Sequence, residues 1–249
     1  LDLNGPGSLA ANQQFIRGNI LWRLGLYEEA RLEFEDLRFS ILDDPEANYR
    51  LSYHLYDIGL YRSAIFCARR VLDIALLSDA ETLHAPDYFN FIRFGLYYPD
   101  LVKDNVVIYN LDPLTFYSMM RQESLFEGFV SSSAGARGLM QIMPATGESV
   151  ATRLGWPLNY GSDDLYRPAV SITLGADYLS GLINYFDGEI YPALAGYNAG
   201  PGNAAIWWDL ANGDPDLFAE IIRFKETRTY IKHIYEIFSI YEVIYSEIE

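Results

Sequence analysis

The sequence predicts a mainly α-helical protein in which an N-terminal set of helical hairpins precedes a helical domain without repeats. Three observations support this prediction: a repeat near the N-terminus, helix-start signals such as Asp112-Pro113 and Arg167-Pro168, and the absence of sustained strand alternation. With 249 residues, half of them hydrophobic, the chain can bury a large core in one or two domains.

A repeat with a period of about 34 residues runs through the first part of the chain. Within it, Ala30, Phe34 and Leu37 share one face of a helix. Each unit is therefore predicted to be a helical hairpin, turning at Gly25-Leu26-Tyr27 and at Gly59-Leu60-Tyr61. The repeated positions are Leu21, Gly25, Tyr27, Ala30, Phe34, Leu37 and Ile41, which recur as Leu55, Gly59, Tyr61, Ala64, Ala68, Val71 and Ala75.

The small and aromatic positions of this repeat, Gly18 included, resemble tetratricopeptide repeats, although the proline that closes such units is absent. Two hairpins are fewer than the three usually needed for a free-standing array, so we expect them to stack on the next part of the chain or to continue a longer array. The first helices of the hairpins are expected to carry the apolar residues Ile16, Ile20 and Leu24, then Leu51, Leu55 and Ile58. We predict tetratricopeptide-like repeats in residues 1–85, a connector at 86–96, and a separate helical domain at 97–249.

Composition excludes several classes of function. No stretch approaches the roughly 20 uncharged apolar residues that span a bilayer. The formal net charge of -16 argues against a nucleic acid or an anionic membrane as partner. Cys67 is the only cysteine, so an internal disulfide is impossible, and we expect it to be buried. His54, His84 and His233 lack neighbours at metal-ligand spacing, so we expect neither a metal nor a cofactor.

The first candidate for chemistry is Glu123. Asp112 is predicted to cap a helix whose apolar stripe, Phe116, Met119 and Met120, leads directly to Glu123. A carboxyl group on such a face is poorly solvated when ionised, so its pKa should rise and it could donate a proton near neutral pH. Taken alone, a glutamate at a helix end is more often a solvated or capping residue.

The segments that come after Glu123 strengthen this interpretation. Residues 131–141 form a loop of small side chains that ends in the amide of Gln141, and a substrate can closely approach the backbone of such a loop. Residues 195–202 place a phenol and an amide, Tyr197 and Asn198, between glycines, although this segment could equally be a turn that ends a helix.

Two further segments have simpler interpretations. Asp163-Asp164 could supply a second carboxylate, but capping of the next helix is favoured. Trp207-Trp208 could stack on sugars, but core packing is favoured.

Taken together, these motifs resemble the soluble lytic transglycosylases, in family order over roughly residues 97–245. The matching pieces are Arg121-Gln122-Glu123-Ser124, Ser132 with Gly135-Ala136, Gly138-Leu139-Met140-Gln141-Ile142-Met143-Pro144, Gly175 with Tyr178-Leu179, Tyr197-Asn198-Ala199-Gly200-Pro201-Gly202, and Glu226-Thr227-Arg228 with Tyr230. The resemblance implies a lysozyme-like catalytic domain preceded by helical repeats.

Residue by residue, the resemblance implies that Glu123 is the catalytic acid/base. It implies that Ser132, Gln141 and Tyr197 line the sugar site and that Met140 shapes the cleft floor. Ser124, Asn198, Glu226 and Tyr230 are implied as supporting residues, the last three holding the Tyr197 segment and the closing helix. Gly196 departs from the family, which usually has alanine before Tyr-Asn; the change loosens the backbone without removing a functional group.

The activity implied is cleavage of the β-1,4 bond between N-acetylmuramic acid and N-acetylglucosamine in peptidoglycan, with formation of 1,6-anhydromuramyl ends. Two alternatives stay open: a hydrolase of the goose-lysozyme type, which delivers water, and a non-catalytic glycan-binding scaffold. The implied substrate predicts a location in the cell envelope, and no signal peptide is recognisable in the sequence. The partners expected are glycan strands and, through the repeats, another protein.

Overall fold

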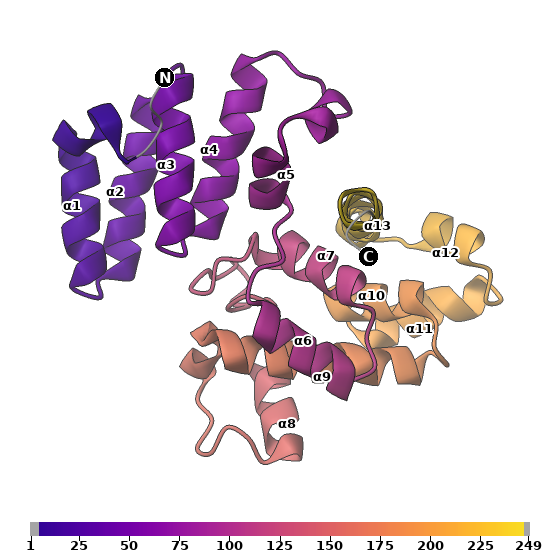
Figure 1. Ribbon diagram of the computed structural model, residues 1–249. Coiled ribbons are helices and arrows are strands. Elements are labelled where there is room, and N and C mark those ends of the chain that lie inside the picture. Colours follow the sequence, from indigo (N-terminus) through magenta and orange to yellow (C-terminus); the bar gives the residue numbers. More distant parts are fainter. Residues whose placement is uncertain (1–4, 247–249) are drawn as a thin grey trace. The chain divides into compact units, whose positions relative to one another are not determined.

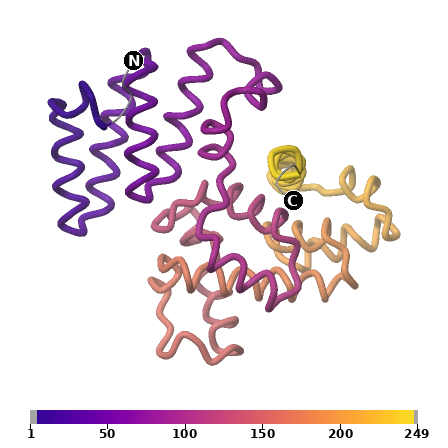
Figure 2. Tube along the Cα trace, in the orientation of Figure 1, coloured from indigo at the N-terminus to yellow at the C-terminus, as the bar shows by residue number. Residues whose placement is uncertain are grey.

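The computed structural model describes residues 5–246, which fold into two compact units (Figures 1 and 2). The first unit ends at Leu96 and the second begins at Tyr97. Helices dominate both units, and the described residues contain isolated β-bridges but no β-strand. The mainly α-helical prediction is therefore confirmed. No helix in residues 5–246 combines the length and the apolar character needed to cross a membrane.

The first unit consists of two helical hairpins followed by a short helix. Its 3-10 helices are η1 (Gly7–Ala11) and η2 (Glu81–His84), and its α-helices are α1 (Gln13–Arg23), α2 (Tyr27–Ser40), α3 (Pro45–Asp57), α4 (Tyr61–Ile74) and α5 (Asp87–Arg93). Helix α1 pairs with α2, and α3 pairs with α4. Both turns use a glycine in the left-handed region, Gly25 at φ 77° and Gly59 at φ 86°, where L side chains are strained. The hairpins and their turns lie where the repeat predicts them.

The repeated small and aromatic residues form the core of this unit. Phe34, Ala64 and Ala68 are fully buried, and so is Cys67, as its predicted packing role requires. Gly18 lies against Phe34, because a Cβ at position 18 would stand 2.8 Å from the ring. The repeated positions are therefore those whose side chains pack between the two helices of one hairpin and between successive hairpins.

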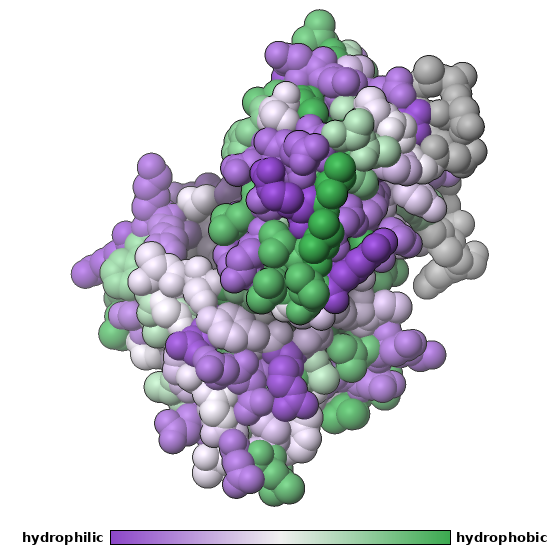
Figure 3. All heavy atoms as spheres, turned by 90° about the vertical axis from the view of Figure 1, so that its left-hand side faces the viewer, coloured by the Kyte–Doolittle hydropathy of each residue, from purple (hydrophilic) through white to green (hydrophobic). Residues whose placement is uncertain are grey.

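The apolar residues of α1 differ from expectation. Ile16, Ile20 and Leu24 are exposed, whereas Leu51 and Leu55, the residues expected for the first helix of the second hairpin, are buried. Each of the two helices contacts the other helix of its hairpin and also η1, so η1 does not cover the exposed residues of α1. Figure 3, which faces the side of the molecule where α1 lies, shows a strip of hydrophobic residues among polar ones. Periodicity identifies residues that share a face; it does not supply the element that covers that face.

The segment 86–96, predicted as a connector, contains α5. The hydroxyl of Tyr88 lies 2.7 Å from that of Ser52 in α3, and the Tyr88 ring packs on Tyr49 with centroids 4.9 Å apart. Asn90 donates a hydrogen bond to the Leu83 carbonyl. These contacts make the segment part of the first unit.

The second unit is a cluster of helices around α9. Its elements are α6 (Pro99–Ile108), α7 (Pro113–Ser124), α8 (Pro144–Leu154), η3 (Ser162–Tyr166), α9 (Pro168–Tyr185), α10 (Ile190–Ala199), α11 (Pro201–Leu210), α12 (Pro215–Ile221) and α13 (Lys225–Tyr245). Proline at the first position begins several of them, because its missing N–H is not needed there. Helix α9 contacts α6, α8 and α10, while α13 packs on α7 and α10.

The loop between α7 and α8 is held in one shape by backbone contacts. Bridges join Ser131 to Arg137 and Arg137 to Ile142. Gly138, at φ 74°, donates from its N–H to the Val130 carbonyl. A Cβ at position 138 would lie 1.9 Å from the backbone oxygen of Leu165, so the close approach of these two backbones requires glycine.

Gly138→Ala should therefore destabilise the protein by about 3 kcal/mol or more, because a steric clash with backbone adds to left-handed strain. Gly135→Ala is the matched control: Gly135 has φ 90° but open space around its Cβ position, so only about 1–2 kcal/mol of strain is expected. Thermal melting of both variants measures the difference. Equal losses would show that the approach of Leu165 does not constrain the loop.

Candidate active site

Helix α7 delivers Glu123 to a cavity. The Asp112 side chain accepts the N–H of Thr115 at 2.7 Å and caps the helix, as predicted. The stripe of Phe116, Met119 and Met120 is fully buried and anchors the helix to the core. The anchored face leads to Glu123, which lies one residue before the end of the helix and is half-buried.

Ser124 shapes the helix end behind Glu123. Its hydroxyl donates to the Met120 carbonyl at 3.1 Å and accepts the Phe126 N–H at 3.0 Å. Leu125 comes next in the left-handed conformation, which turns the chain away from the helix. Ser124 is buried and acts on the backbone, outside the cavity.

The cavity has a volume of about 690 Å³ and lies among α7, the 131–143 loop, the end of α10 and the start of α13. It brings together most of the residues that the sequence singled out: Glu123, Ser132, Gln141, Tyr197, Asn198, Glu226 and Tyr230. Lining residues that the sequence reasoning did not assign include Gln122, Met143, Lys225, Thr229 and His233. Segments about 100 residues apart in the chain thus converge on one carboxyl group.

Met140 is placed differently from expectation, because its side chain does not line the cavity. It is fully buried against Gly175, where an added Cβ would stand 2.6 Å from the Met140 Cγ. Its carbonyl oxygen instead accepts the Tyr197 hydroxyl at 2.8 Å. The methionine that faces the cavity is Met143, which is 43% exposed.

The 131–143 loop presents one amide oxygen to the cavity. Gln141 donates from Nε2 to the carbonyls of Gly138 at 2.8 Å and Val130 at 3.1 Å. Both amide hydrogens are used in this way, so Oε1 is the polar atom of Gln141 that is left to accept a hydrogen bond. Ser132 accepts the N–H of Ala136 at 3.0 Å, which leaves its own hydroxyl proton to donate.

The segment with Tyr197 and Asn198 is the last turn of α10, which ends at Gly200 with φ 85°. The helix-ending alternative therefore holds for this segment. Thr227 donates its hydroxyl to Asn198 Oδ1 at 2.7 Å and so ties α10 to α13. Thr227 is 1% exposed and belongs to the Glu226-Thr227-Arg228 motif, which is the signal that could have assigned it this role.

A short hydrogen bond joins Glu123 to α13. The Tyr230 hydroxyl donates to Glu123 Oε1 at 2.5 Å. Burial raises the pKa of Glu123 to about 7, and the hydrogen bond from Tyr230 opposes part of that rise by stabilising the carboxylate. Burial also raises the pKa of Tyr230 well above its ordinary value, and the charge of Glu123 adds to this rise, so the phenol keeps its proton. The site therefore holds a carboxylic acid that can both give and take a proton near neutral pH.

The remaining sequence candidates have structural roles. Asp163 pairs with Arg137 at 2.5 Å, and Asp164 lies inside η3, where it accepts the Gly161 N–H at 2.9 Å; neither side chain caps α9, the next α-helix. Trp207 is buried with its ring centroid 5.1 Å from that of Phe224. In residues 5–246 no three His, Cys, Asp or Glu side chains are grouped as a metal would need.

Comparison with known proteins finds a family whose model matches part of the second unit, up to α12. Residues 100–216 match the family of the Transglycosylase SLT domain. A soluble lytic murein transglycosylase of Salmonella typhimurium is 35% identical over 144 residues, which cover 57% of this chain and 22% of that protein. A membrane-bound lytic murein transglycosylase C of Glaesserella parasuis is 32% identical over 119 residues, covering 45% of this chain and 32% of that protein. The chain thus spans about a fifth to a third of the length of these relatives.

Solved structures show the same likeness over nearly the whole chain. The 70 kDa soluble lytic transglycosylase of Escherichia coli superposes with a TM-score of 0.78 at 25% identity, covering 97% of this chain and 37% of that one. An inactive mutant of the lytic transglycosylase Slt of Pseudomonas aeruginosa gives a TM-score of 0.76 at 27% identity, covering 98% of this chain and 37% of that one.

The raised pKa of Glu123 predicts a pH-dependent effect on stability. An acid whose pKa rises from 4.5 to about 7 on folding is harder to ionise in the folded state, so its burial increasingly destabilises the protein as pH rises between those values. Glu123→Gln should be more stable than the parent by up to about 3 kcal/mol at pH 8, with little of this difference near pH 4.5. Urea unfolding at both pH values measures it. Glu226→Gln, which alters an exposed carboxylate of the same cavity, is the control, and a Glu123→Gln gain that is equal at both pH values would contradict the prediction.

Proposed function

Because this chain belongs to the soluble lytic transglycosylase family, we propose that its second unit cleaves the β-1,4 bond between N-acetylmuramic acid and N-acetylglucosamine in peptidoglycan, leaving 1,6-anhydromuramyl ends. The observation that carries this proposal is the carboxyl group of Glu123, which lies in a cavity of about 690 Å³ and whose pKa burial raises to about 7. Near neutral pH such a group is present in both the protonated and the ionised form. It can therefore protonate a leaving group and, once ionised, take up a proton again.

The reaction uses Glu123 twice. The protonated carboxyl group first gives its proton to the glycosidic oxygen, and the bond from C1 of the muramic residue to that oxygen breaks. The resulting carboxylate then takes the proton of the C6 hydroxyl as that oxygen bonds to C1. The N-acetylglucosamine leaves with a new hydroxyl group, the acid is restored, and no water is consumed.

The scarcity of carboxylates favours this route over hydrolysis. Glycosidases generally place two carboxyl groups on either side of the bond, one as acid and one as base or nucleophile. Glu226 is the other carboxylate that lines the cavity, but it is exposed, and the pKa of Glu123 reflects burial and the Tyr230 hydrogen bond with no charge effect from Glu226. The C6 hydroxyl is already held beside C1 and gains a large effective concentration over water.

We assign roles in sugar binding to the other polar side chains from the atoms that make no hydrogen bond within the protein. Gln141 Oε1 accepts from a sugar hydroxyl or amide, and the Ser132 hydroxyl donates to one. Tyr197 has its hydroxyl committed to the Met140 carbonyl, so it offers a ring to a sugar face. Tyr230 positions and tunes Glu123.

Asn198 and Ser124 act further from the sugar. Asn198 holds the end of α10 to α13 through Thr227, and Ser124 keeps the end of α7 in shape. Glu226 lines the cavity as an exposed carboxylate. The proposed substrate also places the protein in the cell envelope.

Glu123→Gln keeps the shape of the side chain and removes the proton, so turnover of purified peptidoglycan should fall by about 100- to 10,000-fold. Activity of Glu123→Gln within threefold of wild type would remove Glu123 from the reaction.

Mass analysis of the wild-type products should show mostly anhydromuramyl ends, which are lighter than hydrolysed ends by one water. A majority of reducing muramic ends would assign the protein to the hydrolases instead, and glycan binding without turnover would identify the scaffold alternative.

The rate should fall as pH rises through about 7, because cleavage needs protonated Glu123. Tyr230→Phe removes the hydrogen bond that lowers this pKa, so the descending limb of the kcat profile should move to higher pH. Tyr185→Phe removes the hydroxyl group of an exposed tyrosine, and it should leave the descending limb of the kcat profile at the same pH. A shift to lower pH in Tyr230→Phe would contradict the assigned role.

A further inference from the structure

The chain carries five sulfur-containing side chains, four methionines and one cysteine, and they differ sharply in exposure. Three of the methionines are fully buried, namely Met119, Met120 and Met140. Cys67 is fully buried as well, and burial raises the pKa of its thiol, so its reactive thiolate form is scarce. Met143, at 43% exposed, is the sulfur-containing residue that solvent reaches.

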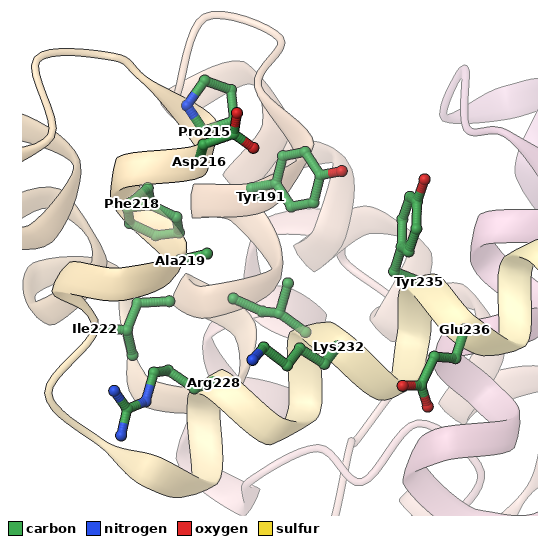
Figure 4. Close-up of a pocket in the computed structure, with 11 residues that line it drawn as sticks. Tyr191, Pro215, Asp216, Phe218, Ala219, Ile222, Arg228, Lys232, Tyr235 and Glu236 are labelled. Carbon is green, nitrogen blue, oxygen red and sulfur yellow. The ribbon is translucent and has the colours of Figure 1, made fainter.

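The exposed thioether lies in the same cavity as Glu123. Two other cavities of the second unit have no sulfur among the described residues that line them. One, of about 240 Å³, lies between α12, the start of α10 and α13 (Figure 4). The other lies between α8, α9 and the start of α11. A small oxidant that enters these cavities therefore meets sulfur in the cavity that holds the candidate acid.

The backbone around Met143 directs its side chain into the cavity. Ile142 and Arg137 exchange two backbone hydrogen bonds, at 3.0 and 3.1 Å, just before it. Pro144 favours extended backbone at the residue before it, and Met143 has φ -66° and ψ 139°. The Met143 carbonyl accepts the Gly147 N–H at 2.9 Å in the first turn of α8. Because neighbouring side chains of an extended segment point to opposite sides, the burial of Ile142 in the core is matched by the exposure of Met143 in the cavity.

We propose that Met143 is a site of reversible oxidation, and that its sulfoxide slows the cleavage of glycan in this cavity. The second part of the inference rests on the proposed function. The oxidant is hydrogen peroxide. The thioether sulfur attacks one peroxide oxygen, a sulfur–oxygen bond forms as the oxygen–oxygen bond breaks, and the other oxygen leaves as water with both hydrogens. Sulfur loses two electrons and the peroxide gains them.

The reverse step also balances. Methionine sulfoxide reductases return the sulfoxide to the thioether, with two thiol groups as reductant. The thiols become a disulfide, and the sulfoxide oxygen leaves as water. The modification can therefore be removed without new synthesis of the protein.

The sulfoxide changes the chemistry of the cavity wall. A thioether is apolar and can lie against the C–H face of a sugar, whereas a sulfoxide is polar and its oxygen can only accept hydrogen bonds. Gln141, two residues earlier in the chain, offers only the acceptor Oε1, because both its amide hydrogens are bonded to backbone carbonyls. The Ser132 hydroxyl is the donor that the proposed function gives to the sugar, so a sulfoxide that used it would compete with the glycan.

The cost of oxidation therefore appears when the glycan binds. In the free protein the exposed sulfoxide is hydrated. A glycan that fills the cavity displaces this water, and a polar group that loses its water without a new partner weakens binding. We expect kcat/KM to fall about tenfold, mainly through a higher KM, which corresponds to about 1.4 kcal/mol.

Treatment of the whole chain with hydrogen peroxide, followed by peptide mass analysis and a cleavage assay on purified peptidoglycan, tests the proposal. Met143 should gain one oxygen atom before any other methionine does, because the other three are fully buried. The fall in kcat/KM should follow the fraction of Met143 that is oxidised. Methionine sulfoxide reductase with dithiothreitol should restore both the mass and the rate.

Two matched variants identify the residue responsible. Met143→Leu removes the sulfur at similar volume, and Met119→Leu removes a buried sulfur and retains Met143. The rate of each variant after treatment is divided by its own rate before treatment, so a change in basal rate cancels. This ratio should stay within about twofold of one in Met143→Leu and fall about tenfold in Met119→Leu, as in the unmodified chain.

Several results would overturn the proposal. These are earlier oxidation of a buried methionine, an equal loss of rate in Met143→Leu, and unchanged cleavage once Met143 is fully oxidised. The melting temperature should stay within about 2 °C on oxidation, because the sulfoxide is on the surface, and a loss of rate caused by unfolding would also overturn the proposal. An untreated chain that cleaves no glycan would remove the proposed function, whereas the peptide masses would still decide whether Met143 is the oxidation site.

Discussion

The hydrogen bond from Tyr230 to Glu123 is the interaction on which the second unit depends. It joins residues 107 apart in sequence and locates the N-terminal half of α13 against the end of α7. Burial makes ionisation of the Glu123 carboxyl group unfavourable, and the hydrogen bond from the Tyr230 phenol offsets only part of that penalty. The pKa of Glu123 is therefore raised to about 7. Any displacement of α13 would alter both the hydrogen bond and the burial, and hence the protonation of Glu123.

The contacts around this bond explain why the unit needs its many helix–helix connections. Buried Ile231, Ile234 and Ile237 fasten α13 along its length. Thr227 ties the start of α13 to Asn198 at the end of α10. These restraints hold the donor and the acid within hydrogen-bonding distance before any substrate arrives, which is the preorganisation that acid catalysis requires.

Local sequence patterns identified the elements that rest on local physics. The spacing of Ala30, Phe34 and Leu37 predicted the hairpins, because the helical period decides which side chains meet. Asp112-Pro113 marked the start of α7, and the buried stripe behind Glu123 predicted the direction of its pKa shift. The exposure of Ile16 and Ile20 escaped this reasoning, because a periodic face needs a neighbouring helix to cover it.

By itself, the sequence determined that the chain is helical, where its hairpins turn, and that one glutamate ends an apolar helix face, since these depend on interactions within a few residues. Tertiary structure alone decided that Met143 and not Met140 faces the cavity, because the irregular backbone of the 131–143 loop has no period. It also decided that Tyr230 donates directly to Glu123 and that Thr227 donates to Asn198. These arrangements join segments far apart in the chain, and only the packing of whole helices brings such groups together.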